Sequence, residues 1–188
     1  MTRHREEVAG TPASRRLVLL RHAKAEPATT PDDVLRPLAL RGRTQAAGLA
    51  AALVSLGAAP DVVLVSSALR TRQTWELAGN GLSGRSRDNG PRVTVTDDLY
   101  NARVGDVLRL VGEVADDART VLVIGHEPTM AATAAYLAGP GSDDAALAQV
   151  RVGVPTATYS LLEAPEHEPW STWGRGTAVL RHVGRPQG

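Results

Sequence analysis

The chain has 188 residues, enough to bury one sizeable hydrophobic core, and its length alone does not require two domains. Its 21 basic and 20 acidic residues leave a formal net charge of +1, so no overall basic field favours nucleic acid or a membrane surface as a partner. With no Phe, three Trp and three Tyr, the chain has too few aromatic side chains for a base-stacking platform. The absence of Cys excludes disulfides, thiolate metal sites and cysteine-based phosphatase chemistry.

The N-terminal segment is expected to be a flexible tail. Residues 1–14 are charged and polar and lack the apolar centre of a secretory signal, so we expect residues 15–188 to form a single domain. No uninterrupted apolar stretch reaches the length of a membrane span. We therefore expect a cytoplasmic protein, a location with which the absence of Cys is compatible.

Segments typical of strands and of helices alternate along the chain. The predicted strands are residues 16–20, 62–65, 93–96, 121–124, 156–162 and 177–183, and the predicted helices are residues 38–56, 68–78, 105–118 and 128–137. Residues 79–91 and 139–144 are expected to be loops. This order indicates an α/β fold, a three-layer sandwich with a mainly parallel sheet covered by helices on both faces. The last two strands are close enough in sequence to pair as an antiparallel hairpin, which would make the sheet mixed.

Side chains suited to phosphate follow three of the predicted strands. Arg21 and His22 come directly after the first strand, Ser67 and Arg70 after the second, and His126 after the fourth. Because ligands of α/β proteins bind at the carboxyl ends of the strands, we expect these residues to meet at one edge of the sheet. Each also has a structural explanation, as a solvated surface arginine or a histidine bonded within the core. Three independent strand ends of this kind would be an odd coincidence for purely structural residues.

Two arginines and two histidines suit the transfer of a phosphoryl group. Guanidinium groups are planar, always charged and hold phosphate with several hydrogen bonds. A neutral imidazole can attack phosphorus to form a phosphohistidine that water then hydrolyses, and a second histidine can donate a hydrogen bond to a phosphoryl oxygen. Backbone N–H groups at the helix starts near Ala68 and Pro128 would add to anion binding. We therefore expect chemistry that needs no metal and no other cofactor.

The remaining histidines are expected to be solvated or structural. His4 lies in the tail, His167 lies among charged loop residues, and His182 lies in the last predicted strand. No Asp or Glu cluster has the spacing of a metal site, so the expected site is limited to the three strand ends.

Three motifs of this chain resemble those of the histidine phosphatase superfamily, the phosphoglycerate-mutase-like clan. The motifs are residues 19–23 (LLRHA), residues 66–74 (SSALRTRQT) and residues 125–126 (GH). Residues 38–46 (LALRGRTQA) also resemble the family's helix after the first motif, so the resemblance extends over about residues 16–138. Together the motifs are far more specific than any one of them. The resemblance implies a phosphoglycerate-mutase-like fold.

The resemblance also implies roles for the residues at the strand ends. By resemblance the nucleophile is His22. The residues of the phosphate pocket and of substrate binding are then Arg21, Ser67, Arg70 and His126. Within the superfamily, residues 21–26 and 36–38 resemble the opening of the small phosphohistidine phosphatases of the SixA type. The short chain also leaves little room for the lid segments of sugar-phosphate mutases.

The chain departs from the superfamily where many members carry a glutamic acid. Mutases and many ester phosphatases of this clan have a Glu general acid after the third strand, but residues 97–102 read DDLYNA here. Losing such an acid costs an ester phosphatase on the order of 10²–10⁴-fold in rate. A phosphoramidate depends less on it, because its leaving nitrogen can be protonated beforehand. The departure therefore favours N–P substrates, with Glu26, Asp97 and Asp98 remaining as alternative proton donors.

Three hypotheses from different classes follow. The leading one is a metal-independent phosphatase that acts through a phosphorylated His22 on phosphohistidine proteins. The second is a phosphatase or mutase for small phosphate esters such as sugar or nucleotide phosphates. The third is a silent phosphate-binding domain, against which the complete set of pocket residues argues. The expected partner is a phosphorylated protein or a small phosphorylated metabolite, with neither nucleic acid nor a membrane involved.

Overall fold

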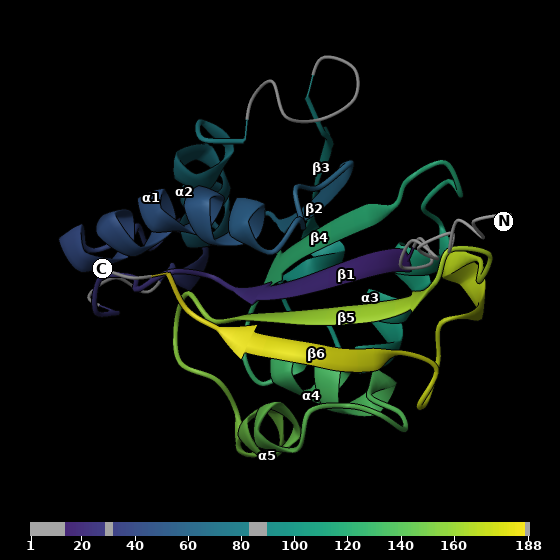
Figure 1. Ribbon diagram of the computed structural model, residues 1–188. Coiled ribbons are helices and arrows are strands. Elements are labelled where there is room, and N and C mark those ends of the chain that lie inside the picture. The colour runs from purple at the N-terminus through teal and green to yellow at the C-terminus, as the bar shows by residue number, and fades with distance from the viewer. Residues whose placement is uncertain (1–13, 29–31, 83–89, 187–188) are drawn as a thin grey trace, which may run out of the picture.

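The computed structural model describes residues 14–28, 32–82 and 90–186 (Figure 1). Its centre is a six-stranded sheet with the strand order β3-β2-β4-β1-β5-β6. The strands are β1 (Ser14–Arg21), β2 (Val62–Ser66), β3 (Arg92–Thr96), β4 (Thr120–Gly125), β5 (Tyr159–Pro165) and β6 (Val179–Gly184). The tail predicted for residues 1–14 lies outside the described residues except for Ser14, with which β1 begins.

The sheet is mixed, as predicted. β1 and β2 both pair parallel with β4, and β3 pairs parallel with β2. β5 pairs antiparallel with β1 and with β6, so the last two strands form the expected antiparallel pair. Arg21 lies opposite Gly125 and Val65 lies opposite Ile124, which places the carboxyl ends of β1, β2 and β4 level at one edge of the sheet.

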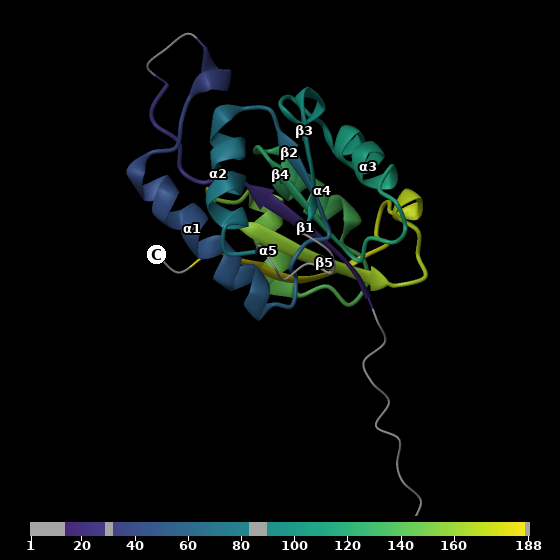
Figure 2. The same ribbon diagram turned by 90° about the horizontal axis from the view of Figure 1, so that it is seen from above.

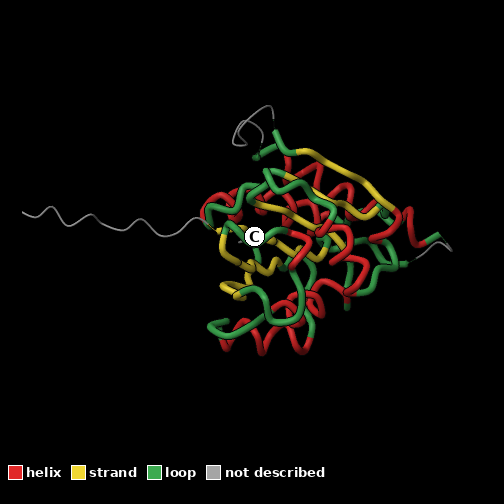
Figure 3. Tube along the Cα trace, turned by 90° about the vertical axis from the view of Figure 1, so that its right-hand side faces the viewer, coloured by secondary structure: helices red, strands yellow, loops and turns green. Residues whose placement is uncertain are grey.

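Helices cover both faces of this sheet (Figures 2 and 3). α1 (Leu40–Ser55) and α2 (Leu69–Gly79) pack on one face. The other face carries α3 (Val104–Gly112), α4 (Thr129–Leu137) and α5 (Asp144–Val152). Three short 3-10 helices complete the described elements: η1 (Asp33–Leu35), η2 (Asp97–Leu99) and η3 (Trp170–Thr172). The arrangement is the predicted three-layer α/β sandwich.

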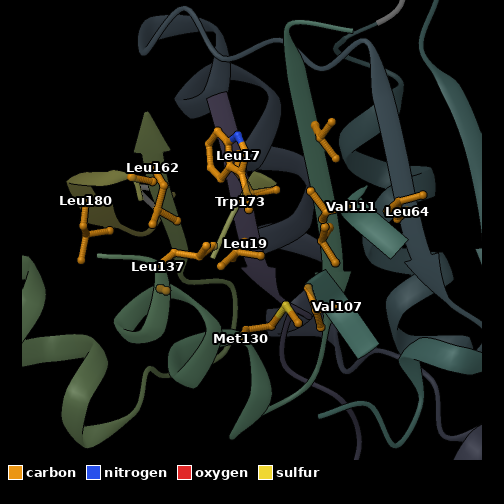
Figure 4. Packing of buried hydrophobic residues seen from close by; sticks show 14 of the residues in the cluster. Leu17, Leu19, Leu64, Val107, Val111, Met130, Leu137, Leu162, Trp173 and Leu180 are labelled. Carbon is orange, nitrogen blue, oxygen red and sulfur yellow. The ribbon is translucent and has the colours of Figure 1, made fainter. Parts of the chain in front are cut away.

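Strand β1 is buried on both of its faces because its side chains alternate between two hydrophobic clusters. Leu19 packs in the cluster that contains Met130 of α4 (Figure 4). Leu20 packs in the opposite cluster with Leu53 of α1. Burying a side chain of this size stabilises the fold by about 1.5–3 kcal/mol. The end of β1, which carries the predicted nucleophile, is therefore held between two helical layers.

The structure has one helix that was not predicted, and it corrects the bounds of other elements. The strand predicted over residues 156–162 lies three residues later, as β5. Helix α5 was not predicted, because it is short and follows a Gly-containing loop; Asp143 caps it by accepting a hydrogen bond from the backbone N–H of Ala146 at 2.8 Å. The helix predicted over residues 105–118 ends at Gly112. The carbonyl groups of Asp116 and Ala118 beyond it accept hydrogen bonds from Arg15 instead. Residues 83–89 of the loop expected over residues 79–91 lie outside the described residues.

None of the helices in the described ranges combines the length and the apolar character that crossing a membrane requires.

Candidate active site

The predicted site residues come to the same edge of the sheet, at the carboxyl ends of β1, β2 and β4. Arg21 is the last residue of β1 and His22 follows it, while His126 directly follows β4. Arg70 lies in the first turn of α2, just after β2. The rings of His22 and His126 have centroids 5.2 Å apart. The three strand ends therefore meet as their sequence positions predicted.

The His22 ring is buried and fixed in one orientation. Only 7% of the residue is exposed, and its backbone N–H donates to the carbonyl oxygen of Gly125 at 3.1 Å. Its Nδ1 lies 2.7 Å from the carbonyl oxygen of Ala23. A carbonyl only accepts hydrogen bonds, so Nδ1 carries the proton and Nε2 of the neutral ring carries the free lone pair. This is the tautomer that a nucleophilic Nε2 requires.

The environment keeps His22 neutral. Burial, the largest effect, and the positive charges of Arg70 and Arg21 together lower its pKa to about 4, although the hydrogen bond to Ala23 acts in the opposite direction. At neutral pH the ring is therefore uncharged, and its lone pair is available without loss of a proton.

His126 is the second imidazole of the site. Its Nε2 lies 2.8 Å from Oγ of Ser66, and Nη2 of Arg70 lies 3.4 Å from its Nδ1. An arginine N–H can only donate, so in this arrangement Nδ1 accepts and Nε2 donates to Ser66. Burial, the largest effect, and the neighbouring His22 and Arg70 together lower the pKa of His126 to about 3. The positive charge of the site is consequently carried by arginines, not by this histidine.

Arg70 is not the solvated surface arginine that its helix position alone would allow. It is 5% exposed, and its guanidinium is bound from one side by Asp33. Nη1 donates to the Asp33 carbonyl oxygen at 2.8 Å and Nη2 donates to Oδ2 of the same residue at 2.9 Å. The first turn of α2, which carries Arg70, is held by the Thr71 hydroxyl. This hydroxyl donates to the carbonyl oxygen of Ser66 at 2.7 Å. Arg70 is thus a rigidly placed cation next to both histidines.

Arg21 borders a pocket next to the site. Its Nη1 donates to the carbonyl oxygen of Val154 at 2.6 Å. The pocket, of about 500 Å³, is lined by Arg21, Glu127, Pro128 and residues 152–155. Burial raises the pKa of the Glu127 carboxyl, an effect that the charge of Arg21 opposes. Arg21 therefore belongs both to the histidine pair and to this neighbouring pocket.

Three buried polar atoms of the predicted site have no hydrogen-bond partner within the protein. They are Nε of Arg21, Nε of Arg70 and Oγ of Ser67. Buried donors are almost always satisfied, so unpaired ones need an explanation. An anion with several acceptor oxygens, such as a phosphoryl group, is the kind of ligand that two guanidinium groups and a hydroxyl would hold.

Sequence reasoning missed Asp33, Tyr100 and Glu127 as part of this region. The Tyr100 hydroxyl donates to Asp33, and the Tyr100 ring meets His126 edge-on with centroids 5.6 Å apart. Tyr100 lies within residues 97–102, where many members of the superfamily carry the glutamic acid. Asp33 precedes the noted residues 36–38 in the link from β1 to α1, and Glu127 directly follows His126. Their nearness to noted residues was the signal available.

The carboxylates considered earlier as proton donors lie in exposed positions. Glu26 and Asp97 are exposed, and Asp98 is in an ion pair with Arg109 at 2.8 Å. Within the described ranges, no three acidic, histidine or cysteine side chains gather as ligands of a metal ion would.

The remaining histidines lie away from the pair. His167 has a side chain that is 80% exposed, and His182 of β6 stacks against Tyr159 with centroids 5.8 Å apart. His4 lies outside the described residues.

Comparison with known proteins gives the family. A family model described as the histidine phosphatase superfamily (branch 1) matches residues 17–107. An uncharacterized protein of Mycobacterium tuberculosis is 37% identical over 166 residues, which are 86% of this chain and 96% of the relative. The chain belongs to the histidine phosphatase superfamily, and it is a phosphatase-type hydrolase with a phosphoglycerate-mutase-like fold.

Solved structures place the chain near one branch of that family. A structure from Nakamurella multipartitia, named for the phosphohistidine phosphatase SixA, is 32% identical, covers 95% of this chain and 100% of its own, and has a TM-score of 0.78. A second one, from Agrobacterium tumefaciens and named in the same way, is 27% identical, covers 92% of this chain and 99% of its own, and has a TM-score of 0.71. The fold is SixA-like, as the sequence motifs predicted.

Proposed function

We propose that this protein is a metal-independent phosphatase that forms a phosphohistidine on His22 and acts on phosphohistidine proteins. The observation that carries the proposal is the hydrogen bond between Nδ1 of His22 and the carbonyl oxygen of Ala23. It leaves the lone pair on Nε2, while the lowered pKa keeps the ring neutral. A buried, correctly oriented and uncharged imidazole beside two arginines is what attack on phosphorus requires.

The reaction has two steps. Nε2 of His22 attacks phosphorus, a P–Nε2 bond forms, and the bond from phosphorus to the substrate nitrogen breaks with its electron pair moving to that nitrogen. The unpaired donors of Arg21 and Arg70 bind the phosphoryl oxygens as their charge is redistributed. Water then attacks phosphorus, the P–Nε2 bond breaks, and inorganic phosphate leaves while His22 returns to its neutral form.

The proton balance favours a nitrogen leaving group. An alkoxide must be protonated as it leaves, whereas the ring of a phosphohistidine can already carry its proton on the other nitrogen. The carboxylate beside Arg70, that of Asp33, has a lowered pKa and is ionised at neutral pH, so it cannot donate a proton. The similarity to proteins named for phosphohistidine hydrolysis supports the same substrate class.

One observation favours the second candidate, hydrolysis of small phosphate esters. Burial raises the pKa of Glu127, which lies beside Arg21. A protonated carboxyl here would be able to act as a general acid for an ester leaving group. Both of its oxygens are buried, but so are Nε of Arg21 and Nε of Arg70, so burial alone does not exclude this carboxyl from the site. A Glu127→Gln variant tests this candidate. If the variant loses turnover of esters but keeps turnover of phosphohistidine, Glu127 is the general acid.

The proposal is tested by side-by-side turnover of a phosphohistidine peptide and a panel of sugar, nucleotide and aryl phosphates, with a chelator present. We expect kcat/KM to be highest for the peptide, and the His22→Ala variant to lose on the order of 10³-fold or more for every substrate. His167→Ala, which changes an exposed histidine, is the matched control. A higher kcat/KM for an ester would instead favour a phosphatase of small phosphate esters. Phosphate binding without turnover of any substrate would indicate a catalytically silent domain.

A further inference from the structure

Ser66 holds the second imidazole of the site from the end of β2. It is fully buried, and its Oγ lies 2.8 Å from Nε2 of His126. Its backbone is fixed as well, because Ser66 pairs with Thr96 of β3 and its carbonyl oxygen accepts a hydrogen bond from the Thr71 hydroxyl. Among the described residues the Ser66 hydroxyl makes no other hydrogen bond. It is therefore free to rotate about its Cβ–Oγ bond, and toward His126 it can either accept or donate.

The other ring nitrogen of His126, Nδ1, faces Arg70. Nη2 of Arg70 lies 3.4 Å from Nδ1, which is long for a hydrogen bond, and the same Nη2 donates to Oδ2 of Asp33 at 2.9 Å. The contact of Nδ1 with Arg70 is thus one that a better partner can replace. Nε of the same guanidinium is buried without a partner, and in the proposed reaction it binds the phosphoryl group. Of the two ring nitrogens, Nδ1 is therefore the one beside the phosphate-binding arginine, whereas Nε2 is bonded to the strand end.

The tautomer that these contacts favour does not suit a bound phosphoryl group. With Nε2 donating to Ser66, Nδ1 presents a lone pair. Phosphoryl oxygens are negatively charged acceptors, so this lone pair would repel them. A second proton on the ring does not remove the conflict, because burial, together with His22 and Arg70, lowers the pKa of His126 to about 3. The other neutral tautomer, with the proton on Nδ1, is the form that can donate to phosphate.

We infer, on the basis of the proposed function, that Ser66 is a positioning residue that lets His126 exchange one neutral tautomer for the other when a phosphoryl group binds. Before binding, Nε2–H donates to Oγ of Ser66. In the complex, Nδ1–H donates to a phosphoryl oxygen, while the Ser66 hydroxyl rotates and donates to Nε2. One proton passes from Nε2 to water and one passes from water to Nδ1, so the charge of the ring does not change.

The contrast with the nucleophile shows what a serine contributes at this position. Nδ1 of His22 is bonded to the carbonyl oxygen of Ala23, which can only accept, so His22 keeps its proton on Nδ1 throughout. The Ser66 hydroxyl can bond either form of Nε2 and therefore satisfies this buried nitrogen in both tautomers of His126. One histidine is thus locked for attack, and the other is free to present a donor to the phosphoryl group.

The test is to read the tautomer of His126 from long-range proton–nitrogen NMR spectra of protein labelled with ¹⁵N at histidine. Protonated and unprotonated ring nitrogens have well separated ¹⁵N shifts, and replacement of His126 assigns its resonances. The spectra are recorded at neutral pH with and without saturating inorganic phosphate. We expect the proton of His126 on Nε2 without phosphate and on Nδ1 with phosphate. His22 should keep its proton on Nδ1 in both spectra and is the internal control.

The Ser66→Ala variant tests whether the serine is responsible. Nε2 of His126 then has no partner in either tautomer, so we expect an incomplete exchange with phosphate and a kcat/KM lower by about 5- to 100-fold, the effect of leaving one buried polar group unpaired. The matched control is Ser55→Ala, which removes an exposed hydroxyl that donates to the carbonyl oxygen of Ala52 in α1. This control should stay within about twofold in kcat/KM and show the complete exchange.

Three spectra of the unaltered protein would overturn the inference and leave the proposed function standing. They are a proton that remains on Nε2 with phosphate, a proton already on Nδ1 without phosphate, and a doubly protonated His126 in the complex. An unchanged exchange and an unchanged kcat/KM in Ser66→Ala would overturn the role of the serine in the same way. Failure of the unaltered protein to turn over any phosphorylated substrate would instead overturn the proposed function, and this inference with it.

Discussion

His22 and His126 lie with ring centroids 5.2 Å apart at an interplanar angle of 60°, and both rings are neutral at neutral pH. The two rings differ in what they bond. His22 is bonded through Nδ1 to a backbone carbonyl, which frees Nε2, whereas His126 bonds Ser66 through Nε2. In the proposed reaction one imidazole would act as the nucleophile and the other as a polar neighbour of the phosphoryl group, while Arg21 and Arg70 would supply the positive charge.

The first prediction concerns the titration of this pair. Because burial and the neighbouring arginines disfavour the imidazolium form, His22 should titrate near pH 4 and His126 near pH 3 in the protein without ligand. Each pKa is below that of the unfolded chain, so the unfolded state binds more protons at mildly acidic pH. The stability that the neutral rings contribute is then complete above about pH 6.5, the ordinary pKa of histidine, and is lost as the pH falls through about 4 for His22 and about 3 for His126.

Side-chain NMR, with each resonance assigned by single histidine replacement, measures both titrations directly. Protonation of either ring between pH 6 and 7 would contradict the burial of the site.

The second prediction concerns Arg70. Arg70→Ala should lower kcat/KM by about 10²–10³-fold, because a donor that follows the phosphoryl charge into the transition state is lost. Arg70→Lys should recover little of this, since an ammonium group cannot both bond Asp33 in the same way and bind phosphate. Arg72→Ala, which alters an exposed arginine on the same helix, is the control and should stay within about twofold. Steady-state kinetics of the three variants on one substrate decides the matter.

The third prediction is that inorganic phosphate stabilises the protein. The unpaired buried donors on Arg21, Ser67 and Arg70 give the folded state a binding site that the unfolded chain lacks. At 100 times its dissociation constant, phosphate should raise the free energy of unfolding by about 2.7 kcal/mol. Thermal unfolding with increasing phosphate measures the effect. An equal shift in Arg70→Ala would mean that phosphate binds elsewhere.

The fourth prediction concerns Gly42, which brings α1 close to the loop after the nucleophile. A Cβ atom at position 42 would overlap the carbonyl oxygen of Lys24. The backbone N–H of Lys24 also donates to the side chain of Gln45, which like Gly42 lies in α1, at 3.0 Å. Gly42→Ala should therefore destabilise the protein by about 2–4 kcal/mol and displace the segment after His22. Gly105→Ala is the matched control, because a Cβ on that residue of α3 has no neighbour within 4 Å. Chemical denaturation of both variants measures the difference, and equal stability would show that the contact is relaxed at little cost.

The sheet and the pocket were predictable for different reasons. Buried parallel strands such as β2 and β4 are continuous apolar runs, and the residue types at their ends indicate an anion. Helix α5 was not predictable because it is short and is fixed by the Asp143 cap and by packing against α4 and β6. Its place depends on the assembled sheet, which local sequence does not report.

The tautomer and the carboxylates of the site also required the structure. A histidine at a strand end indicates chemistry, but only the contact with the Ala23 carbonyl shows which nitrogen is free. Asp33 lies far from Arg70 and Tyr100 in sequence. Its ion pair with Arg70 and its hydrogen bond with Tyr100 therefore correspond to no local sequence pattern from which they could be predicted. Residues 97–102, the family position of the general acid, contain no Glu, whereas Glu127 directly follows His126.

The central claim, covalent catalysis by His22, is tested most directly by trapping the intermediate. The protein is mixed rapidly with phosphoimidazole, quenched in alkali, in which phosphohistidine is stable, and mapped by mass spectrometry of its peptides. We predict one phosphoryl group, on Nε2 of His22, appearing before inorganic phosphate is released and absent in His22→Ala. Steady turnover with no covalent phosphate, or with the phosphoryl group on His126, would contradict the account.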